Sequence, residues 1–404
     1  MTAVETTPRS DPLVGSALEG RYRVDAVIAT GGMSTVYRGL DTRLDRPVAL
    51  KVMDARYSGD RQFLTRFERE AKAVARLKGD GLVTVYDQGV DGQHPFLVME
   101  LIDGGTLREL LRERGPMPPH AVAAVLAPIC RGLATAHAAG LVHRDVKPEN
   151  VLIADDGEVK IADFGLVRAV AEAGITSTSV ILGTAAYLSP EQVGSGAAGP
   201  RSDVYAVGIL AYELLTGRTP FTGDTALSVA YQRMDNDVPP PSSAIAGVPA
   251  QFDELIRRAT DRDPAGRFAD ATALGDALAE VIDELGLPSF RVPAPQQSAQ
   301  HRAATEFHSQ VMQHAGTDGV RPPEPHRDTR VLTPAELPLP PKSSDDPETN
   351  RVTGQFAGID IEQFRWARRR DERVLLGWVA IVVILAGLLA AGAWMLGTNL
   401  ANLL

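Results

Sequence analysis

The sequence predicts an α+β fold with two lobes, a small strand-rich lobe followed by a larger helical lobe. Three observations predict it. Residues 22–28, 46–53 and 96–100 are short runs rich in β-branched residues with rough apolar alternation, which is typical of strands. Beyond Gly104 the apolar segments instead have helical length and spacing. Residues 20–286 contain no low-complexity stretch, so the whole region is expected to fold.

One helix is expected to interrupt the strands of the small lobe, over residues 63–77. Its apolar residues fall near one face: Phe63, Phe67, Ala71, Val74 and Leu77. The large lobe is expected to contain apolar helices at 121–139 and 202–215. These elements place the small lobe at about 20–101 and the large lobe at about 104–286.

Composition excludes several classes of protein. The 404 residues include 41 basic and 51 acidic side chains, a net charge of -10, so direct nucleic-acid binding is not expected. The apolar share of 44% is enough for a core. The single cysteine, Cys130, excludes an internal disulfide and any multi-cysteine metal site. It lies in an apolar helix, which favours a buried core residue over a reactive thiol.

Both ends of the folded region are expected to be flexible. Residues 1–19 are polar and lack the apolar core of a signal peptide. Residues 287–364 are predicted to form a flexible juxtamembrane linker, because residues 288–350 contain 11 prolines and few apolar side chains. Two alternatives within the linker are a polyproline II ligand at 338–341 and a metal site, although the histidines are irregularly spaced. These are His301, His308, His314 and His326.

A transmembrane helix is predicted at residues 374–396, a run of 23 residues without a charge. As a helix it spans about 34 Å, enough to cross a bilayer core. Residues 365–373 carry five arginines and precede it, whereas the tail 397–404 is uncharged. The positive-inside rule therefore predicts a single-pass protein of the cell membrane with its N-terminal part cytoplasmic and its C-terminus outside. The arginines are expected to contact membrane lipid, either from an amphipathic helix or from a plain stop-transfer flank.

Three short motifs carry the chemistry: VALK at residues 48–51, HRDVKPEN at 143–150 and DFG at 163–165. In this order and at these separations, they resemble the eukaryotic-like, or Hanks-type, bacterial protein kinases over residues 20–286. The resemblance implies the bilobal protein kinase fold and transfer of the γ-phosphate of ATP to protein hydroxyls. Lys147 followed by Pro148 is similar to the serine/threonine version. A kinase domain, a proline-rich linker and one membrane span together resemble the membrane-anchored actinobacterial members.

The resemblance implies a catalytic role for four residues. Lys51 holds the α- and β-phosphates, and Glu70 orients it, with Glu68 as the competing candidate. Asp145 accepts the proton of the substrate hydroxyl. Lys147 neutralises the transferred phosphoryl group.

The resemblance also implies a nucleotide and metal site. Asn150 and Asp163 are hard oxygen ligands suited to Mg²⁺, with Mn²⁺ as an alternative. Met99 corresponds to the residue at the back of the adenine pocket. The glycine-rich loop departs from the family pattern at Ala29 and Ser34, which leaves its closure open. The residues implied to contact ATP and its metal are Ile28, Gly31, Gly32, Ser34, Val36, Ala49, Lys51, Met99, Glu100, Ile102, Asn150 and Asp163.

Regulation by phosphorylation is also implied. Thr176 and Thr178 align with autophosphorylated threonines of related kinases, and Arg144 is the expected phosphate partner. Phosphorylation in trans implies a transient homodimer. The remaining implied structural roles are packing below the metal-binding loop by Phe164, contact of Thr184 with the catalytic loop, bracing of that loop by Asp203, and an ion pair of Glu191 with Arg267.

Two other functions remain as alternatives. The first is a pseudokinase that serves as a membrane-bound scaffold, which the presence of Lys51, Asp145, Asn150 and Asp163 disfavours. The second is an envelope interaction protein whose important part is the linker and the span.

Overall fold

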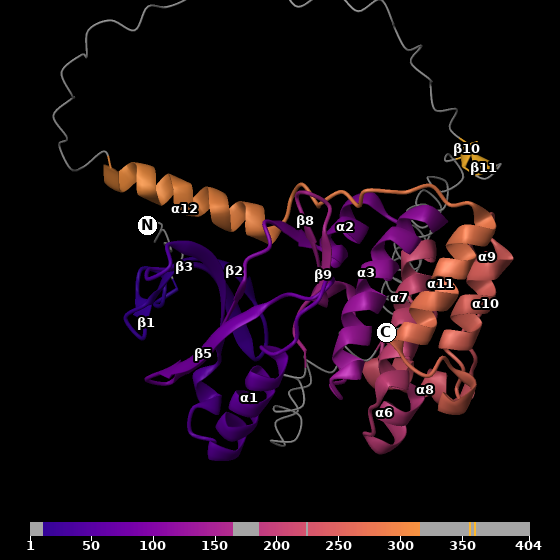
Figure 1. Cartoon of the computed structure of the whole chain (residues 1–404), viewed down its shortest axis with the longest axis horizontal. Coiled ribbons are helices and arrows are strands. Elements are labelled where there is room, and N and C mark those ends of the chain that lie inside the picture. The colour runs from indigo at the N-terminus through magenta and orange to yellow at the C-terminus, as the bar shows by residue number, and fades with distance from the viewer. Residues whose placement is uncertain (1–10, 165–185, 224, 316–354, 357–358, 361–404) are drawn as a thin grey trace, which may run out of the picture.

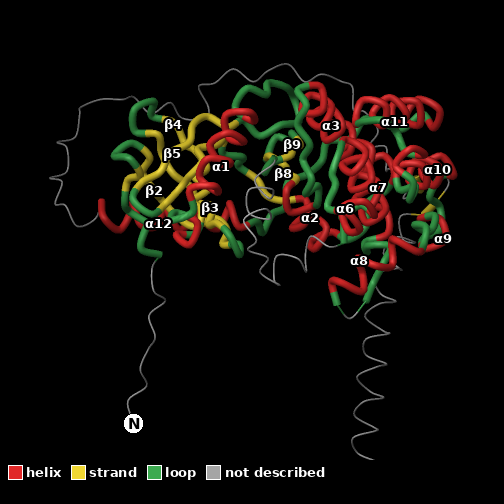
Figure 2. Tube along the Cα trace, turned by 90° about the horizontal axis from the view of Figure 1, so that it is seen from below, coloured by secondary structure: helices red, strands yellow, loops and turns green. Residues whose placement is uncertain are grey.

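The computed structural model describes residues 11–164, 186–223, 225–315, 355–356 and 359–360. Within them, a strand-rich lobe and a helical lobe lie beside one another (Figure 1). Figure 2 shows the strands gathered at one end of the molecule and most helices at the other. The predicted two-lobed α+β fold is therefore confirmed.

The small lobe is built on a six-stranded sheet in the order β1-β2-β3-β4-β6-β5. Its strands are β1 (Ala17–Leu18), β2 (Tyr22–Thr30), β3 (Ser34–Asp41), β4 (Arg46–Met53), β5 (Val85–Asp91) and β6 (His94–Glu100). All the pairings are antiparallel. Strand β4 lies in the interior and is buried from Val48 to Met53, which explains its nearly continuous apolar sequence. The register sets Lys51 between Val36 of β3 and Leu97 of β6.

Helix α1 (Arg61–Val74) is the predicted helix of the small lobe. It begins where the Asp60 carboxylate accepts hydrogen bonds from the backbone N–H groups of Gln62 and Phe63, which satisfies two free donors of the first turn. Phe63 and Phe67 form its fully buried face and stack at 6.0 Å between ring centroids. The helix ends three residues before the predicted end at 77.

The large lobe is mainly helical. Its helices are α2 (Leu107–Arg114), α3 (Pro119–Ala138), α6 (Pro190–Ser195), α7 (Pro200–Thr216), α8 (Ala226–Asp235), α9 (Pro241–Ala244), α10 (Ala250–Ala259) and α11 (Ala271–Leu285). The two predicted helices start earlier than expected because Pro119 and Pro200 each occupy the first helical position, where a missing N–H costs nothing. The hinge, residues 99–102, connects the two lobes, and a small sheet of the large lobe begins directly after it. Its strands are β7 (Gly104–Thr106), β8 (Val151–Ala154) and β9 (Val159–Ile161).

Helix α3 is the centre of the large-lobe core. Among the described residues it alone is long and apolar enough to span a membrane by length and composition, but it packs against α7 and α11 as a core helix. It carries Cys130, which is 1% exposed. Burial raises the pKa of this thiol to about 12, which fits a structural residue. The predicted span at 374–396, its flank 365–373 and the tail 397–404 lie outside the described residues.

The predicted flexible N-terminus is wrong for its last residues. Leu18 is 2% exposed and packs with Tyr22 and Val24, while β1 pairs with the start of β2. A strand of two residues buries only one side chain and leaves no periodic signal in the sequence. Residues 1–10 lie outside the described part.

The predicted flexible linker is also wrong where it begins. Residues 287–298 run in an extended path over the large lobe, and α12 (Ala299–Ala315) follows and lies against the small lobe (Figure 1). Further along, β10 (Gln355–Phe356) pairs with β11 (Ile359–Asp360). The prolines of this segment predict disorder, but partners far away in the sequence hold the segment in place. The rest of the predicted linker lies outside the described residues.

Candidate active site

The glycine-rich turn between β2 and β3 is closed by backbone contacts. Gly31 N donates to Ser34 O at 2.8 Å, and the Arg56 guanidinium donates to Gly32 O at 3.0 Å. The two departures from the family pattern fall on strand residues, because Ala29 pairs with Val36 and Ser34 begins β3. The turn therefore forms a closed hairpin without glycine at those two positions.

Four of the apolar residues predicted to contact ATP pack in one cluster. Ala49 and Met99 are each 7% exposed and belong to one cluster of buried residues. Val36 and Ile102 are partly buried against this cluster. Ile28 lies half-buried on β2. At the hinge, Glu100 N donates to Thr84 O at 2.9 Å, so this N–H is already used.

Lys51 contacts the aspartate of the DFG motif. Its Nζ lies 2.7 Å from Asp163 Oδ1, and this pair joins the small-lobe sheet to the residues that follow β9. Burial alone would raise the pKa of Asp163, but the charge of Lys51 and its hydrogen bond lower it below the ordinary value. Asp163 is therefore held as a carboxylate, the form that binds a cation or stabilises an ammonium group.

Glu70 lies on the half-buried side of α1, and Glu68 on its exposed side. Glu68 faces solvent and contacts Lys72 at 3.6 Å. Glu70 lines a cavity of about 280 Å³ together with Arg144 and Phe164. This placement favours Glu70 over Glu68 as a site residue. The pairing of Glu70 with Lys51 remains a prediction.

The catalytic loop places two of the predicted residues, Lys147 and Asn150, against Asp145. Lys147 Nζ lies 2.8 Å from Asp145 Oδ2, and Asn150 Nδ2 donates to the same oxygen at 3.1 Å and to the Asp145 carbonyl at 2.7 Å. Asp145 is 6% exposed. Its other carboxylate oxygen, Oδ1, is buried and has no hydrogen-bond partner among the described residues. A buried acceptor without a partner is costly, so this oxygen is suited to receive a donor from a substrate.

Two residues of the site have an unusual backbone conformation, one in this loop and one in the DFG motif. Arg144 has a φ of 71° and Asp163 a φ of 68°, which non-glycine residues adopt only when their surroundings impose it. Asp203, fully buried in the first turn of α7, supplies part of that constraint. Its two carboxylate oxygens accept hydrogen bonds at 2.8 Å from His143 N and Arg144 N. Asp203 thus holds the backbone at the start of the catalytic loop.

Phe164 and His143 connect the catalytic loop to the DFG motif. Their rings meet edge to face with centroids 4.4 Å apart. The His143 Nε2 atom lies 2.8 Å from Ala162 O, and both side chains are buried. The histidine therefore acts in packing, at a place where it cannot reach solvent.

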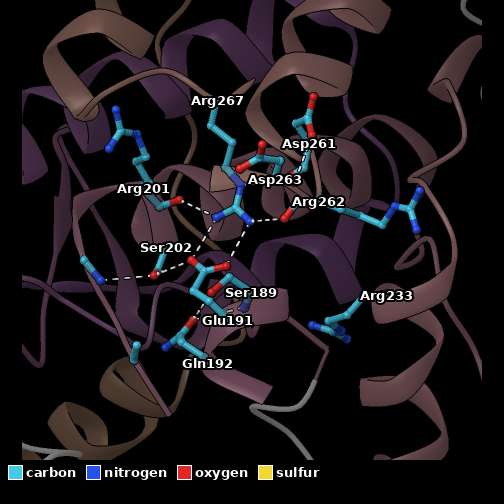
Figure 3. A network of polar contacts seen from close by, with 12 residues as sticks. Ser189, Glu191, Gln192, Arg201, Ser202, Arg233, Asp261, Arg262, Asp263 and Arg267 are labelled. Carbon is cyan, nitrogen blue, oxygen red and sulfur yellow. Dashed lines mark hydrogen bonds and ion pairs between the residues drawn. The ribbon is translucent and has the colours of Figure 1, made fainter. Parts of the chain in front are cut away.

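Glu191 and Arg267 form an ion pair in the large lobe (Figure 3). Two parallel hydrogen bonds of 2.9 Å join them, and Ser202 Oγ donates to Glu191 at 2.6 Å. Burial alone would raise the pKa of Glu191, but these hydrogen bonds lower it to about 2. The pair fixes α6 to the segment before α11.

A second polar cluster was not predicted from the sequence. Arg108 of α2 donates to Glu213 of α7 at 2.6 Å, to Glu149 of the catalytic loop at 2.8 Å, and to the Tyr187 hydroxyl at 2.6 Å. Tyr187 in turn donates to Glu213. The sequence signal is Glu213, a single charged residue within the apolar stretch 204–215 of α7. Its partner cannot be located without the fold.

Thr176, Thr178 and Thr184 lie outside the described residues. Among the described residues, no group of three or more histidine, cysteine or acidic side chains gathers in a way that could hold a metal ion. The predicted Mg²⁺ site needs only Asn150 and Asp163 from the protein. Because Asn150 donates through its amide nitrogen to Asp145, its amide oxygen is turned away from that carboxylate. An amide oxygen and a carboxylate are a suitable donor set for Mg²⁺.

Fold and site together define a protein kinase, and comparison with known proteins agrees. A family profile described as the protein kinase domain matches residues 22–278, so the chain belongs to this family. The crystal structure of the PknI kinase domain of Mycobacterium tuberculosis is similar to this chain, with a TM-score of 0.53 and 27% identity over 66% of this chain and 98% of that one.

Relatives with known names indicate which kind of protein kinase this chain is. Serine/threonine-protein kinase PknL of Mycobacterium tuberculosis is 65% identical over 396 residues, 98% of each chain, and that of Mycobacterium bovis is equally similar. Serine/threonine-protein kinase PknB of Mycobacterium tuberculosis is 42% identical over 272 residues, 66% of this chain and 44% of that protein. The predicted similarity to PknL, based on the sequences at 46–57 and 181–190, is confirmed. The chain is an ATP-dependent serine/threonine protein kinase, and the pseudokinase alternative is not favoured.

Proposed function

We propose that this kinase phosphorylates serine and threonine side chains of proteins from the inner face of the cell membrane, using Mg²⁺ and after phosphorylation of its own loop. The observation that carries the catalytic part is the buried Asp145 Oδ1, which has no partner among the described residues and lies on the same carboxylate that Lys147 contacts. The membrane, metal and regulatory parts rest on sequence.

In the proposed reaction, a substrate hydroxyl donates to Asp145 Oδ1. Its oxygen forms a bond to the γ-phosphorus while the bond from that phosphorus to the β,γ-bridging oxygen breaks, and ADP leaves with the electron pair. The hydroxyl proton passes to Asp145. Lys147 stabilises the negative charge of the transferred group, and Lys51 stabilises the phosphates that stay behind.

A bound Mg²⁺ would neutralise phosphate charge, and Asn150 and Asp163 would hold it. Asn150 is oriented for this by Asp145, and Asp163 is kept ionised by Lys51. With Mn²⁺ the same oxygen ligands would serve.

Membrane attachment is inferred from the uncharged run 374–396 and the arginines at 365–373. The kinase domain then lies in the cytoplasm and the tail 397–404 outside. Anionic lipid is expected to contact the arginines. Removal of residues 374–404 should release the protein from the membrane fraction of cells, and a truncated protein that stayed there would contradict the proposed anchor.

Activation by phosphorylation is inferred for Thr176 and Thr178, with Arg144 as phosphate partner. Because two copies must meet, a transient homodimer forms, and a shared membrane raises its effective concentration. Replacing both threonines by alanine should lower activity, and a rate equal to that of the parent would contradict the mechanism. A specific activity independent of enzyme concentration would contradict phosphorylation in trans.

The decisive experiment is transfer of radiolabelled phosphate from ATP by the purified full chain, with the Asp145→Asn and Lys51→Met variants beside it. We expect label on the parent and at least a 100-fold lower rate for each variant, while exposed Asp156→Asn serves as control. ATP binding without transfer, with Mg²⁺ and with Mn²⁺, would instead support the scaffold function. Full cellular function of the Asp145→Asn protein would support the envelope interaction alternative.

A further inference from the structure

The segment after the last large-lobe helix returns to the small lobe. Residues 287–315, here called the strap, leave α11, pass along the large lobe and end in α12 against β2 and β3 (Figure 1). Val292 in the extended part of the strap is 3% exposed, and Ala303 in α12 is 1% exposed. Each part of the strap therefore has a buried side chain. It therefore touches both lobes, on either side of the hinge.

The first contacts of the strap are with the large lobe. The Phe290 ring meets the edge of His120 of α3, with centroids 4.9 Å apart. Arg291 donates to Asp155 O at 3.0 Å, in the turn between β8 and β9, and the His301 Nε2 atom lies 3.1 Å from the Asp155 carboxylate. The turn between β8 and β9 therefore contacts both the extended part and the helical part of the strap.

Helix α2 holds the middle of the strap through two glutamates. Glu113 accepts a hydrogen bond from Gln296 N, and Glu109 accepts one from Ala299 N, each at 2.8 Å. Ala299 is the first residue of α12, and the other oxygen of Glu109 accepts from Thr106 N, just before α2. One carboxylate therefore caps the N-termini of two helices, where negative charge is favourable.

Two glycines make room for the strap. A Cβ on Gly105 would lie 2.5 Å from Pro295 Cγ and 2.6 Å from Ser298 Cβ. A Cβ on Gly157, whose φ is 88°, would lie 2.6 Å from Arg291 Cγ. Both glycines lie in the small sheet or its turn, far from the strap in sequence. The large lobe is therefore shaped to receive this segment.

The last contacts reach the hinge and the small lobe. Asp103, directly after the hinge, accepts from Arg38 of β3 at 2.9 Å and from Gln300 of α12 at 3.2 Å through the same oxygen. The Arg23 guanidinium of β2 lies 5.8 Å from the centroid of the Phe307 ring. The hinge is thus tied to the small-lobe sheet and to the strap at one point.

We propose that the strap is a positioning segment that holds the two lobes in the closed arrangement needed to bind ATP. The contact of 2.7 Å between Lys51 and Asp163 depends on the distance between the lobes. Because the strap contacts both lobes outside the hinge, it limits how far the lobes separate. When the strap is released, a smaller fraction of the molecules has the closed arrangement that binds ATP, and the apparent Kd for ATP rises in proportion. The proposal rests on the kinase activity stated above and concerns binding rather than the chemical step.

The test uses the full chain, purified in detergent, with the variants Ala303→Asp and Thr305→Asp. Ala303 is the buried residue of the pair and Thr305 is exposed on the same helix. Both variants place an aspartate in α12, but only Ala303→Asp puts a charge into a buried position, which adds to the modest loss of helix propensity that replacing alanine brings. Two quantities are measured for each: the Kd for ATP, by titration, and kcat at saturating ATP. Hydrogen exchange over residues 299–309 reports whether α12 stays docked.

We expect Ala303→Asp to increase exchange in α12 and to raise the Kd for ATP about three- to tenfold with kcat within about twofold of the parent. Thr305→Asp should match the parent in all three measurements. Phe307→Ala is the milder second variant and should raise the Kd about twofold. Increased exchange in α12 with an unchanged Kd for ATP would contradict the proposal that the strap holds the lobes closed. Unchanged exchange in Ala303→Asp would contradict the position of α12 against the small lobe. Loss of all phosphate transfer in Phe307→Ala, with ATP binding intact, would place the strap in the chemical step instead and contradict the proposal.

Discussion

Arg267 reaches Glu191 from a segment 76 positions further along the chain, and the two side chains meet through paired hydrogen bonds of 2.9 Å each. The guanidinium side chain is fully buried and also donates to the carbonyls of Arg201, Asp261 and Arg262. This one side chain therefore joins α6, the start of α7 and the turn before α11 (Figure 3).

Replacing Arg267 by methionine should lower the free energy of unfolding by about 3–5 kcal/mol, because Glu191 would keep a partly buried charge without its partner. Chemical denaturation followed by circular dichroism measures this. Arg257→Met is the matched control: Arg257 pairs with Glu254 at 2.6 Å, but both side chains are more than half exposed. Its cost should stay below about 1 kcal/mol. Equal costs for the two variants would contradict the argument.

The stabilisation by Glu191 should depend on pH in a fixed direction. Its pKa in the folded protein, about 2, lies below the ordinary value of 4.5, so the carboxylate stabilises the fold above pH 4.5 and loses this effect as pH falls toward 2. The difference in stability between the parent and Glu191→Gln should therefore be constant from pH 7 to pH 5 and shrink below that. Denaturation curves across this range measure it, and a difference that grew on acidification would exclude the assignment.

Replacing Asp203 by asparagine should lower kcat while ATP affinity changes little. Asp203 accepts from the backbone of His143 and Arg144, and an amide can satisfy only one of the two donors with its single oxygen. Since Arg144 holds a φ of 71°, the loop should relax and displace Asp145. A shift of this kind costs about 100-fold in rate. Asp237→Asn, at a largely exposed ion pair, is the control and should leave both constants unchanged.

The unpredicted cluster around Arg108 should contribute measurably to stability. Tyr187→Phe removes the hydroxyl that joins Arg108 and Glu213, and should cost about 1–3 kcal/mol because buried polar groups lose a partner. Tyr231→Phe, at a side chain 57% exposed, should cost less than about 0.5 kcal/mol. Urea denaturation of both proteins decides this, and similar midpoints would show that the cluster adds nothing.

The sequence predicted those parts of the molecule whose signals are local. The nearly continuous apolar run of β4 and the apolar face of α1 are patterns within a single element, so the positions of both elements could be predicted. The residues of the catalytic loop could be placed because the motif at 143–150 is short and contiguous. The roles of Asp203 and Arg267 could be predicted only from the family resemblance, because the residues next to them in the sequence do not indicate a partner.

The strap was missed for a physical reason. Two of its anchors are the backbone N–H groups of Gln296 and Ala299, and any non-proline residue supplies such a donor. The residues that receive the strap lie elsewhere in the sequence, in the large lobe: two glutamates of α2 and the glycines Gly105 and Gly157. Few side chains of the strap are buried, so its composition is similar to that of a linker. Only the fold brings the two sides together.

Cys130 lies at the centre of the large-lobe core, with 1% of its surface exposed and a thiol pKa raised to about 12 by burial. Since it is the only cysteine in the chain, one sulfur atom is a natural reporter for the opening of this lobe. A thiol reagent can modify the folded protein only as often as α3 separates from α7 and α11. The rate of labelling, followed by intact mass, therefore counts those openings without any engineered probe.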